Sequence, residues 1–290
     1  MSVSGSGVRV NTECKMKIRA GYTIAYECPQ PTPMILMLSV HPLRAADLIT
    51  PDRLKLDPAI SANTYRDGFG NICHVVHAPK GRLTLSTDFL IEDSGAPDEV
   101  APDAEQHPLE KLPVETLVYL LGSRYCETDR FVKIAWDKFG QVKKGWPLVQ
   151  AICDYVHDRT NFGYEHANPT KTAWHAHAER RGVCRDFAHL AITLCRCMNV
   201  PARYCTGYLG DIGVPAEETP MDFSAWFEVF LGGRWYTFDA RHNVPRIGRI
   251  LMARGRDATD VAITTSFGPN TLAGFKVHTD EMPAEKVATA

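Results

Sequence analysis

The sequence predicts an α+β fold in which an antiparallel β domain precedes a core built of helices and a sheet. Apolar and polar residues alternate through the first ninety or so positions, which is typical of strands. Apolar residues spaced three to four apart begin after residue 113, which is typical of helices. A stretch rich in proline and acidic residues separates the two patterns. We therefore expect a β domain at 1–95, a linker at 96–113 and the core at 114–290.

The composition is that of a globular protein. Of the 290 residues, 44% are hydrophobic and 23% are charged, which argues against a disordered chain. A formal net charge of −2 gives no basic excess for nucleic-acid binding. The longest apolar run, 34–38, is too short to span a bilayer, and the polar start lacks the layout of a secretory signal. We therefore expect a cytoplasmic protein with nine reduced cysteines and neither a nucleic-acid nor a membrane partner.

Strand patterns in the first domain are separated by clear turn signals. Alternation is clearest at 15–26 and 81–91. Two further runs, 63–66 and 72–78, flank the sequence Asp-Gly-Phe-Gly-Asn. These runs indicate an antiparallel β domain, because no stretch of useful length here has helical spacing.

The second domain begins with helices and then returns to strands. Helical spacing is expected at 114–125, 129–139 and 146–160, and a fourth helix starts near Gly182 and stops before Pro201. Strands follow, and they are expected at 202–209, 223–231 and 234–240. Gly232-Gly233 is a two-residue hairpin signal between the last two. Residues 247–280 are expected to add short strands as a C-terminal β extension of this domain.

Cys184 falls in the first turn of the fourth predicted helix. Unpaired N–H groups and the positive end of the helix dipole favour an anion there. A thiolate in such a setting has its pKa lowered from about 8.5 into the range of roughly 3.5–7.5. Arg185 adds to this effect and Asp186 opposes it. The alternative interpretation is a small buried apolar cysteine, but the other eight cysteines lack this position.

The hairpin predicts where two further side chains lie. If Gly232-Gly233 forms the loop, Ser224 and Asp239 share one face of the sheet as diagonal neighbours, with Cβ atoms about 7–8 Å apart. A histidine at 224 could then be held by Asp239 and directed at a thiol beside the sheet. Nucleophile, base and orienting acid have this arrangement in thiol enzymes.

Two motifs resemble the transglutaminase-like superfamily of papain-related enzymes. They are Gly-Val-Cys-Arg-Asp-Phe-Ala-His-Leu around Cys184 and DFSAWFEVFLGGRWYTFDARHN from residue 222. More specifically, the chain resembles bacterial transglutaminase-like proteins with an N-terminal β domain. The resemblance implies a papain-like core and a Cys–His–Asp triad, in which Cys184 matches the nucleophile and Asp239 the orienting acid. At the base position the sequence has Ser224, which cannot accept a proton near neutral pH.

Four other histidines are candidates for a substitute base. Hairpin parity places His242 on the opposite face from Asp239, and His189 is turned well away from Cys184 along the helix. Two more histidines lie in a segment that the pattern does not place, namely His175 and His177. They remain open as substitutes.

The resemblance implies acyl transfer on an amide of a peptide or protein substrate. The Cys184 thiolate would expel an amine and leave a thioester, which water or an amine would resolve. We expect no organic cofactor and no metal, because neither His175 with His177 nor Cys195 with Cys197 has a second pair at a zinc spacing. The alternative function is a catalytically impaired or inactive family member that binds peptides or proteins through its cleft.

Overall fold

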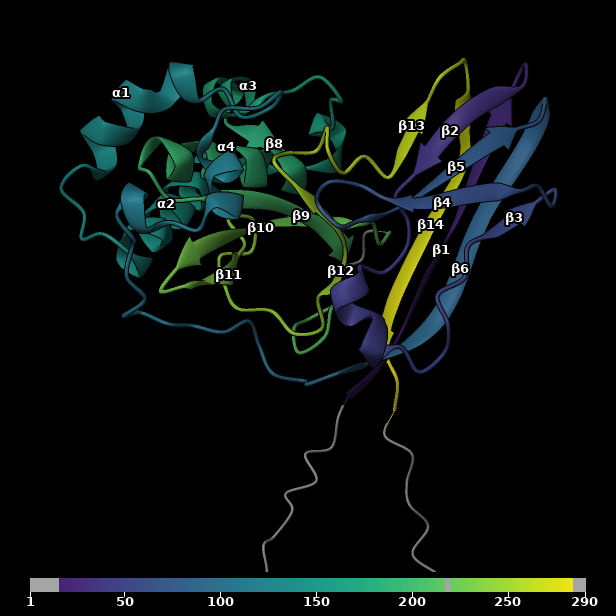
Figure 1. Ribbon diagram of the computed structural model, residues 1–290, viewed down its shortest axis with the longest axis horizontal. Coiled ribbons are helices and arrows are strands. Elements are labelled where there is room, and N and C mark those ends of the chain that lie inside the picture. Colours follow the sequence, from purple (N-terminus) through teal and green to yellow (C-terminus); the bar gives the residue numbers. More distant parts are fainter. Residues whose placement is uncertain (1–15, 217–219, 284–290) are drawn as a thin grey trace, which may run out of the picture.

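The computed structural model describes residues 16–216 and 220–283. The first fifteen residues, with the polar start considered above, lie outside this part. Figure 1 shows a unit of long strands on one side of the molecule and a helical core on the other. Within the described residues, no helix is long and apolar enough to cross a membrane. The predicted α+β class, with a β domain before the core, is confirmed.

Two four-stranded antiparallel sheets form the unit of long strands, which we call the β unit. The first sheet has the order β14-β1-β6-β3, formed by Thr271–Glu281, Met16–Cys28, Gly81–Asp93 and Lys55–Asp57. The second has the order β13-β2-β5-β4, formed by Thr264–Ser266, Thr32–Leu36, Ile72–Ala78 and Ala62–Arg66. Apolar residues from both sheets pack together in one cluster, as the alternating pattern predicts.

The last two strands belong to this β unit, which differs from the predicted C-terminal extension of the core. β14 pairs with β1 from Ile18 opposite Glu281 to Glu27 opposite Thr271. β13 pairs with β2 in the second sheet. Alternation identifies a strand but does not name its partner, so the sequence could not show that the chain returns to its beginning. Figure 1 shows β14 lying along β1.

The core consists of one antiparallel sheet with helices packed around its central helix α4. The sheet has the order β11-β10-β9-β12, formed by Arg234–Phe238, Ser224–Leu231, Ala202–Tyr208 and Ile250–Gly255. The helices are α1 (Thr128–Phe139), α2 (Trp146–Arg159), α3 (Ala173–Glu179) and α4 (Cys184–Cys197). Helix α4 packs against the other three helices and against β9 and β10, so almost all of it is buried.

Short elements complete the chain. They are the 3₁₀ helices η1 (Pro42–Asp47), η2 (Leu109–Lys111), η3 (Val114–Leu120) and η4 (Tyr164–His166), and the strand pair β7 (Asn161–Phe162) and β8 (Arg181–Gly182). The α-helix predicted at 114–125 is therefore wrong in type and length. Over two turns, the spacing of apolar residues hardly separates a 3₁₀ helix from an α-helix.

The core sheet is packed between α4 and the β unit. Phe223, just before β10, makes an edge contact with Tyr22 of β1 at 5.9 Å between ring centroids. Tyr208 of β9 makes a similar contact with Phe89 of β6 at 5.6 Å. The β unit therefore supports the strand from which Ser224 emerges.

The segment predicted as a loosely held linker is fastened to the core. Pro97 forms a bridge with Ile247, and Asp98 binds Arg249. Further along, the carbonyl of Ala104 accepts a hydrogen bond from the N–H of Trp146 at 3.0 Å. In Figure 1 this segment runs along the lower edge of the core. Its polar composition predicted exposure correctly at many positions, but composition does not show which backbone groups are bonded.

Limited proteolysis should nick the chain between residues 93 and 113 without separating the two products. Many side chains there are exposed, which favours cleavage. After cleavage the C-terminal fragment still contributes β13 and β14 to the β unit, so the fragments remain bound through long strand pairings. Native size-exclusion chromatography followed by denaturing electrophoresis checks this. Two separately eluting fragments would contradict the strand order.

Candidate active site

Cys184 is the first residue of α4, and its side chain reaches a cleft. Among the described cysteines it alone is not buried; the buried ones are Cys28, Cys73, Cys126, Cys153, Cys195, Cys197 and Cys205. The buried stripe of α4, which includes Phe187 and Leu190, fixes the helix in the core. At the helix start, Asp186 Oδ2 accepts a hydrogen bond from the N–H of Val183 at 3.0 Å.

The cleft brings together α4, the start of β10 and the turn after β11. Its lining includes Cys184, Asp222, Ser224, Arg241 and His242. The backbone N–H of Ala225 forms a hydrogen bond with the thiol of Cys184. Two of the three predicted site residues, Cys184 and Ser224, therefore lie in one cleft.

The pKa of the Cys184 thiol differs from the prediction. The Cys184 side chain is partly exposed, but protein atoms surround most of its sulfur. This burial of the thiol raises its pKa to about 11, and the negative charge of Asp222 adds to the rise. Arg241 and the N–H of Ala225 act in the opposite direction but do not overcome it. The carboxylate of Asp186 already occupies the positive end of the helix, so less of that charge is left for a thiolate. The thiol is therefore neutral near pH 7, and its reaction requires removal of the proton.

Alkylation of Cys184 by iodoacetamide should rise about tenfold per pH unit between about pH 7 and pH 10, because the thiolate is the reacting form. Asp222→Asn removes a charge that raises the pKa, so it should speed labelling at neutral pH; Arg241→Gln should slow it. Peptide mapping by mass spectrometry gives the rates. A plateau below about pH 8 would instead indicate the lowered pKa that the helix position alone suggested.

The hairpin that leads to Asp239 has the predicted register. Gly232 and Gly233 form the loop with φ of 54° and 87°, which is the left-handed backbone that glycine adopts readily. Leu231 lies opposite Arg234, and pairing continues only as far as Phe227 opposite Phe238. Strand β11 ends there, so Asp239 lies just beyond the paired region.

A tight turn begins at Asp239. The N–H of Asn243 donates to the carbonyl of Asp239 at 2.8 Å, and Asp239 Oδ1 accepts from the N–H groups of Arg241 and His242 at 3.0 and 3.1 Å. Asp239 is buried and lies behind the Cys184 cleft rather than in its lining. Its side chain thus organises the turn that closes one side of the cleft.

His242 contacts Asp239 directly, so its predicted place on the opposite face is wrong. Nδ1 of His242 lies 2.8 Å from Asp239 Oδ2. Alternation of faces holds only while the chain is a strand, and after Phe238 the turn bends residue 242 back over the carboxylate. His242 also lines the cleft that contains Cys184. The sequence does contain a signal for this contact, because His242 follows Asp239 by three residues immediately after a strand, where a turn can bring the two side chains together. The alternation of faces in a hairpin pointed to the opposite conclusion.

Asp239 carries a negative charge that the surrounding groups stabilise. Burial alone would raise its pKa, but the charge of Arg249 and the hydrogen bond from His242 lower the pKa well below its usual range. Arg249 Nη2 lies 2.9 Å from Asp239 Oδ2, while Nε of the same side chain binds Asp98. The buried side chain of Arg249 therefore binds both Asp98 of the predicted linker and Asp239.

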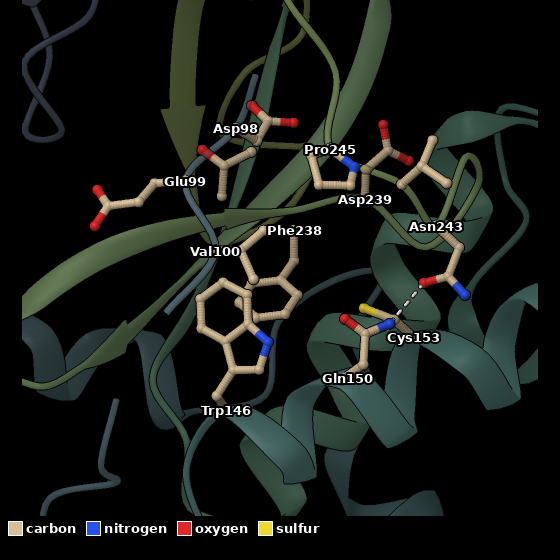
Figure 2. A pocket seen from close by; sticks show the side chains of 12 residues that line it. Asp98, Glu99, Val100, Trp146, Gln150, Cys153, Phe238, Asp239, Asn243 and Pro245 are labelled. Carbon is tan, nitrogen blue, oxygen red and sulfur yellow. Dashed lines mark hydrogen bonds between the residues drawn. The ribbon is translucent and has the colours of Figure 1, made fainter. Parts of the chain in front are cut away.

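Helix α2 supports the turn from behind. Figure 2 shows this rear pocket, where Gln150 points toward Asn243 and its Nε2 donates to Asn243 Oδ1 at 3.0 Å. Asp154 Oδ1 accepts from Asn243 Nδ2 at 2.9 Å, and His157 Nδ1 donates to the carbonyl of Arg241 at 2.9 Å. In the same view the Asp239 carboxylate points away from Trp146. The turn that carries His242 is thus held on several sides.

Ser224 occupies the first position of β10, opposite Gly207 of β9. Its side chain is buried, and its Oγ has no hydrogen-bond partner within residues 16–216 and 220–283. A buried hydroxyl normally has a partner, so this position in the cleft is polar and unsatisfied.

The other histidines that the sequence left open lie elsewhere. His189 is buried, and its Nε2 accepts from the N–H of Ala258 at 3.1 Å. His177 lies 2.9 Å from the hydroxyl of Tyr155, and burial lowers its pKa to about 4. His175 contacts Thr172 at the start of α3. None of the three lines the cleft. Within the described residues, no group of three or more His, Cys, Asp or Glu side chains could hold a metal ion.

The core has the arrangement of the papain-like fold. A cysteine begins the central helix, an antiparallel sheet lies beside it, and a buried aspartate follows one strand of that sheet. Residues 138–240 match the model of the transglutaminase-like superfamily. Over these residues the chain is similar to this superfamily, as its motifs indicated.

Similar proteins extend the likeness beyond the core. A crystal structure of a candidate cysteine protease from Cytophaga hutchinsonii has a TM-score of 0.81 and 28% identity, with 93% of this chain and 92% of that chain covered. An uncharacterized protein of Mycobacterium leprae is 26% identical over 73% of this chain and 77% of its own length. One of Mycobacterium tuberculosis is 29% identical over 72% of this chain and 73% of its own length. The likeness to the crystal structure thus includes the β unit.

Proposed function

We propose that this protein is a cysteine acyl-transfer enzyme that acts on amide bonds of peptides or proteins. Cys184 is the nucleophile and Asp239 the orienting acid. One observation carries the proposal: the single described cysteine that is not buried begins a helix and opens into a cleft backed by a buried, ionised aspartate. The candidate cysteine protease from Cytophaga hutchinsonii supports the same chemistry.

The reaction is acyl transfer through a thioester. Sulfur of Cys184 attacks the amide carbonyl, the C–N bond breaks, and the amine leaves with a proton. Water then releases an acid, as in a protease or amidase, or a lysine amine forms a cross-link, as in a transglutaminase.

A peptide-binding module without catalysis is the second candidate. The neutral thiol of Cys184 and the serine at position 224, where the family motif has its histidine, both favour it. The cleft would then bind an extended peptide without cleaving it.

Incubation with casein and a dansylated primary amine tests the proposal. Fluorescence that becomes attached to casein indicates transfer to an amine, whereas new peptides, or ammonia released without attached fluorescence, indicate transfer to water. Each signal should disappear in Cys184→Ala. Casein that binds equally well to both proteins and stays unmodified would establish the binding module instead.

A further inference from the structure

We infer that His242 is the general base that takes the proton from Cys184, in place of a histidine at position 224. The inference rests on the proposed function, because a base matters only if the thiol is the nucleophile. His242 lies outside the family motif. The motif has its histidine on the strand, at the position that Ser224 occupies in this chain.

The contact with Asp239 fixes the state of the His242 ring. An ionised carboxylate can only accept hydrogen bonds, so Nδ1 of His242 carries the proton across the 2.8 Å contact. In the neutral ring, Nε2 is then left with its lone pair. A neutral imidazole held in this tautomer is prepared to accept a proton, as the histidine of a triad is.

The surroundings place this ring at the thiol cleft. His242 and Cys184 line the same cleft, and the His242 side chain is only 14% exposed. The turn that carries it is bonded to α2 through Asn243 and through the carbonyl of Arg241. Because the ring is largely buried and hydrogen bonds fix the turn, the orientation of His242 in the cleft is restricted.

Ser224 is explained by the same arrangement. Asp239 Oδ2 is already engaged by His242 and by Arg249, and Oδ1 by two backbone N–H groups. The carboxylate therefore has no oxygen left to orient a histidine at 224. The small serine there has an unpartnered Oγ among the described residues, which agrees with a position whose base has moved to another element.

The proton balance closes with His242 alone. Nε2 accepts the thiol proton as sulfur bonds to the amide carbon, and the ring becomes a cation beside Asp239. The ring then gives this proton to the departing amine as the C–N bond breaks. When water attacks the thioester, Nε2 takes a proton from it and returns one to sulfur, which restores the neutral thiol and the free acid.

The test measures the pre-steady-state release of nitrophenolate from p-nitrophenyl acetate, which reports acylation of the thiol. His242→Asn keeps a donor toward Asp239 but cannot take a proton. It should slow acylation by about 10²–10⁴-fold, the contribution typical of a positioned base. His278→Asn is the matched control, because His278 also contacts an aspartate, Asp88, but on β14 in the β unit. It should leave the burst unchanged.

A second measurement separates catalysis from damage to the cleft. Alkylation of Cys184 at a pH high enough to ionise the thiol needs no base, so His242→Asn should leave that rate unchanged while acylation at neutral pH falls. If both rates fall together, His242 has only a structural role and the inference is overturned.

A third measurement places a histidine at position 224 and records the same burst. Ser224→His alone should change the burst little, because His242 already occupies Asp239. In the His242→Ala background it should raise the acylation rate at least tenfold, because alanine leaves Asp239 Oδ2 without the donor that His242 supplies. An equal gain in both backgrounds would show that His242 does not hold Asp239, which contradicts the inference.

The burst also distinguishes failure of the proposed function from failure of the base. A burst that survives Cys184→Ala, or no burst at all, would reject the proposed function itself. A burst that needs Cys184 but not His242 would reject only the assignment of the base.

Discussion

Cys184→Ala should abolish acyl transfer, with a loss on the order of 10⁶-fold in kcat, the size seen when the nucleophile of other acyl-transfer enzymes is removed. Ser224 in the same cleft should not substitute for the thiol, because its Oγ has no hydrogen-bond partner among the described residues that could activate it. The free energy of unfolding should change by less than about 0.5 kcal/mol, since the side chain is only partly buried at a helix end. Steady-state amide or ester turnover and thermal unfolding measure the two effects.

Cys197→Ala is the control at the other end of the same helix. That side chain is buried, and its thiol donates to the carbonyl of Thr128. We expect turnover to stay near the wild-type value while stability falls by about 1 kcal/mol. Loss of turnover in Cys197→Ala but not in Cys184→Ala would place the chemistry at a different site.

Asp239→Asn should lower acylation by about 10²–10⁴-fold at neutral pH. Asparagine can donate a hydrogen bond to Nδ1 of His242, so the ring would carry its proton on Nε2 and could no longer accept one. The same change leaves Arg249 with a single carboxylate, which should lower stability by up to about 3–5 kcal/mol. Burst kinetics and denaturant unfolding measure the two losses.

Asp98→Asn separates the two consequences. It removes the other carboxylate from Arg249 without touching His242. We expect a comparable loss of stability with most of the acylation rate retained. If Asp98→Asn slows acylation as much as Asp239→Asn does, the ion-pair network rather than the His242 tautomer controls the rate.

The strands and the hairpin register could be predicted because they depend on local patterns. Gly232 and Gly233 can both adopt positive φ, so a two-residue loop follows, and the loop fixes which residues lie opposite each other. Cys184 was placed at a helix start for the same reason, since the spacing of apolar residues in α4 marks where the helix begins.

The predictions for His242 and for the pKa of Cys184 were wrong because each applied a rule for one strand or helix to residues or charges outside it. Strand parity was applied to His242, although the strand ends at Phe238 and a turn follows. The dipole at the start of α4 predicts a lowered pKa for Cys184, but burial and the charge of Asp222, which comes from another segment, raise it. The partner of β14 required a pairing across most of the chain, which alternation does not encode.

The most direct measurement locates the acyl group. Wild-type protein is mixed with p-nitrophenyl acetate, quenched in acid during the burst, digested and analysed by mass spectrometry. We expect one acetyl group per molecule, on the peptide that contains Cys184, formed quickly in wild type and slowly in His242→Asn. Acetyl groups on lysines alone, or on another cysteine at the same rate in both proteins, would contradict the assignment of Cys184 as the nucleophile.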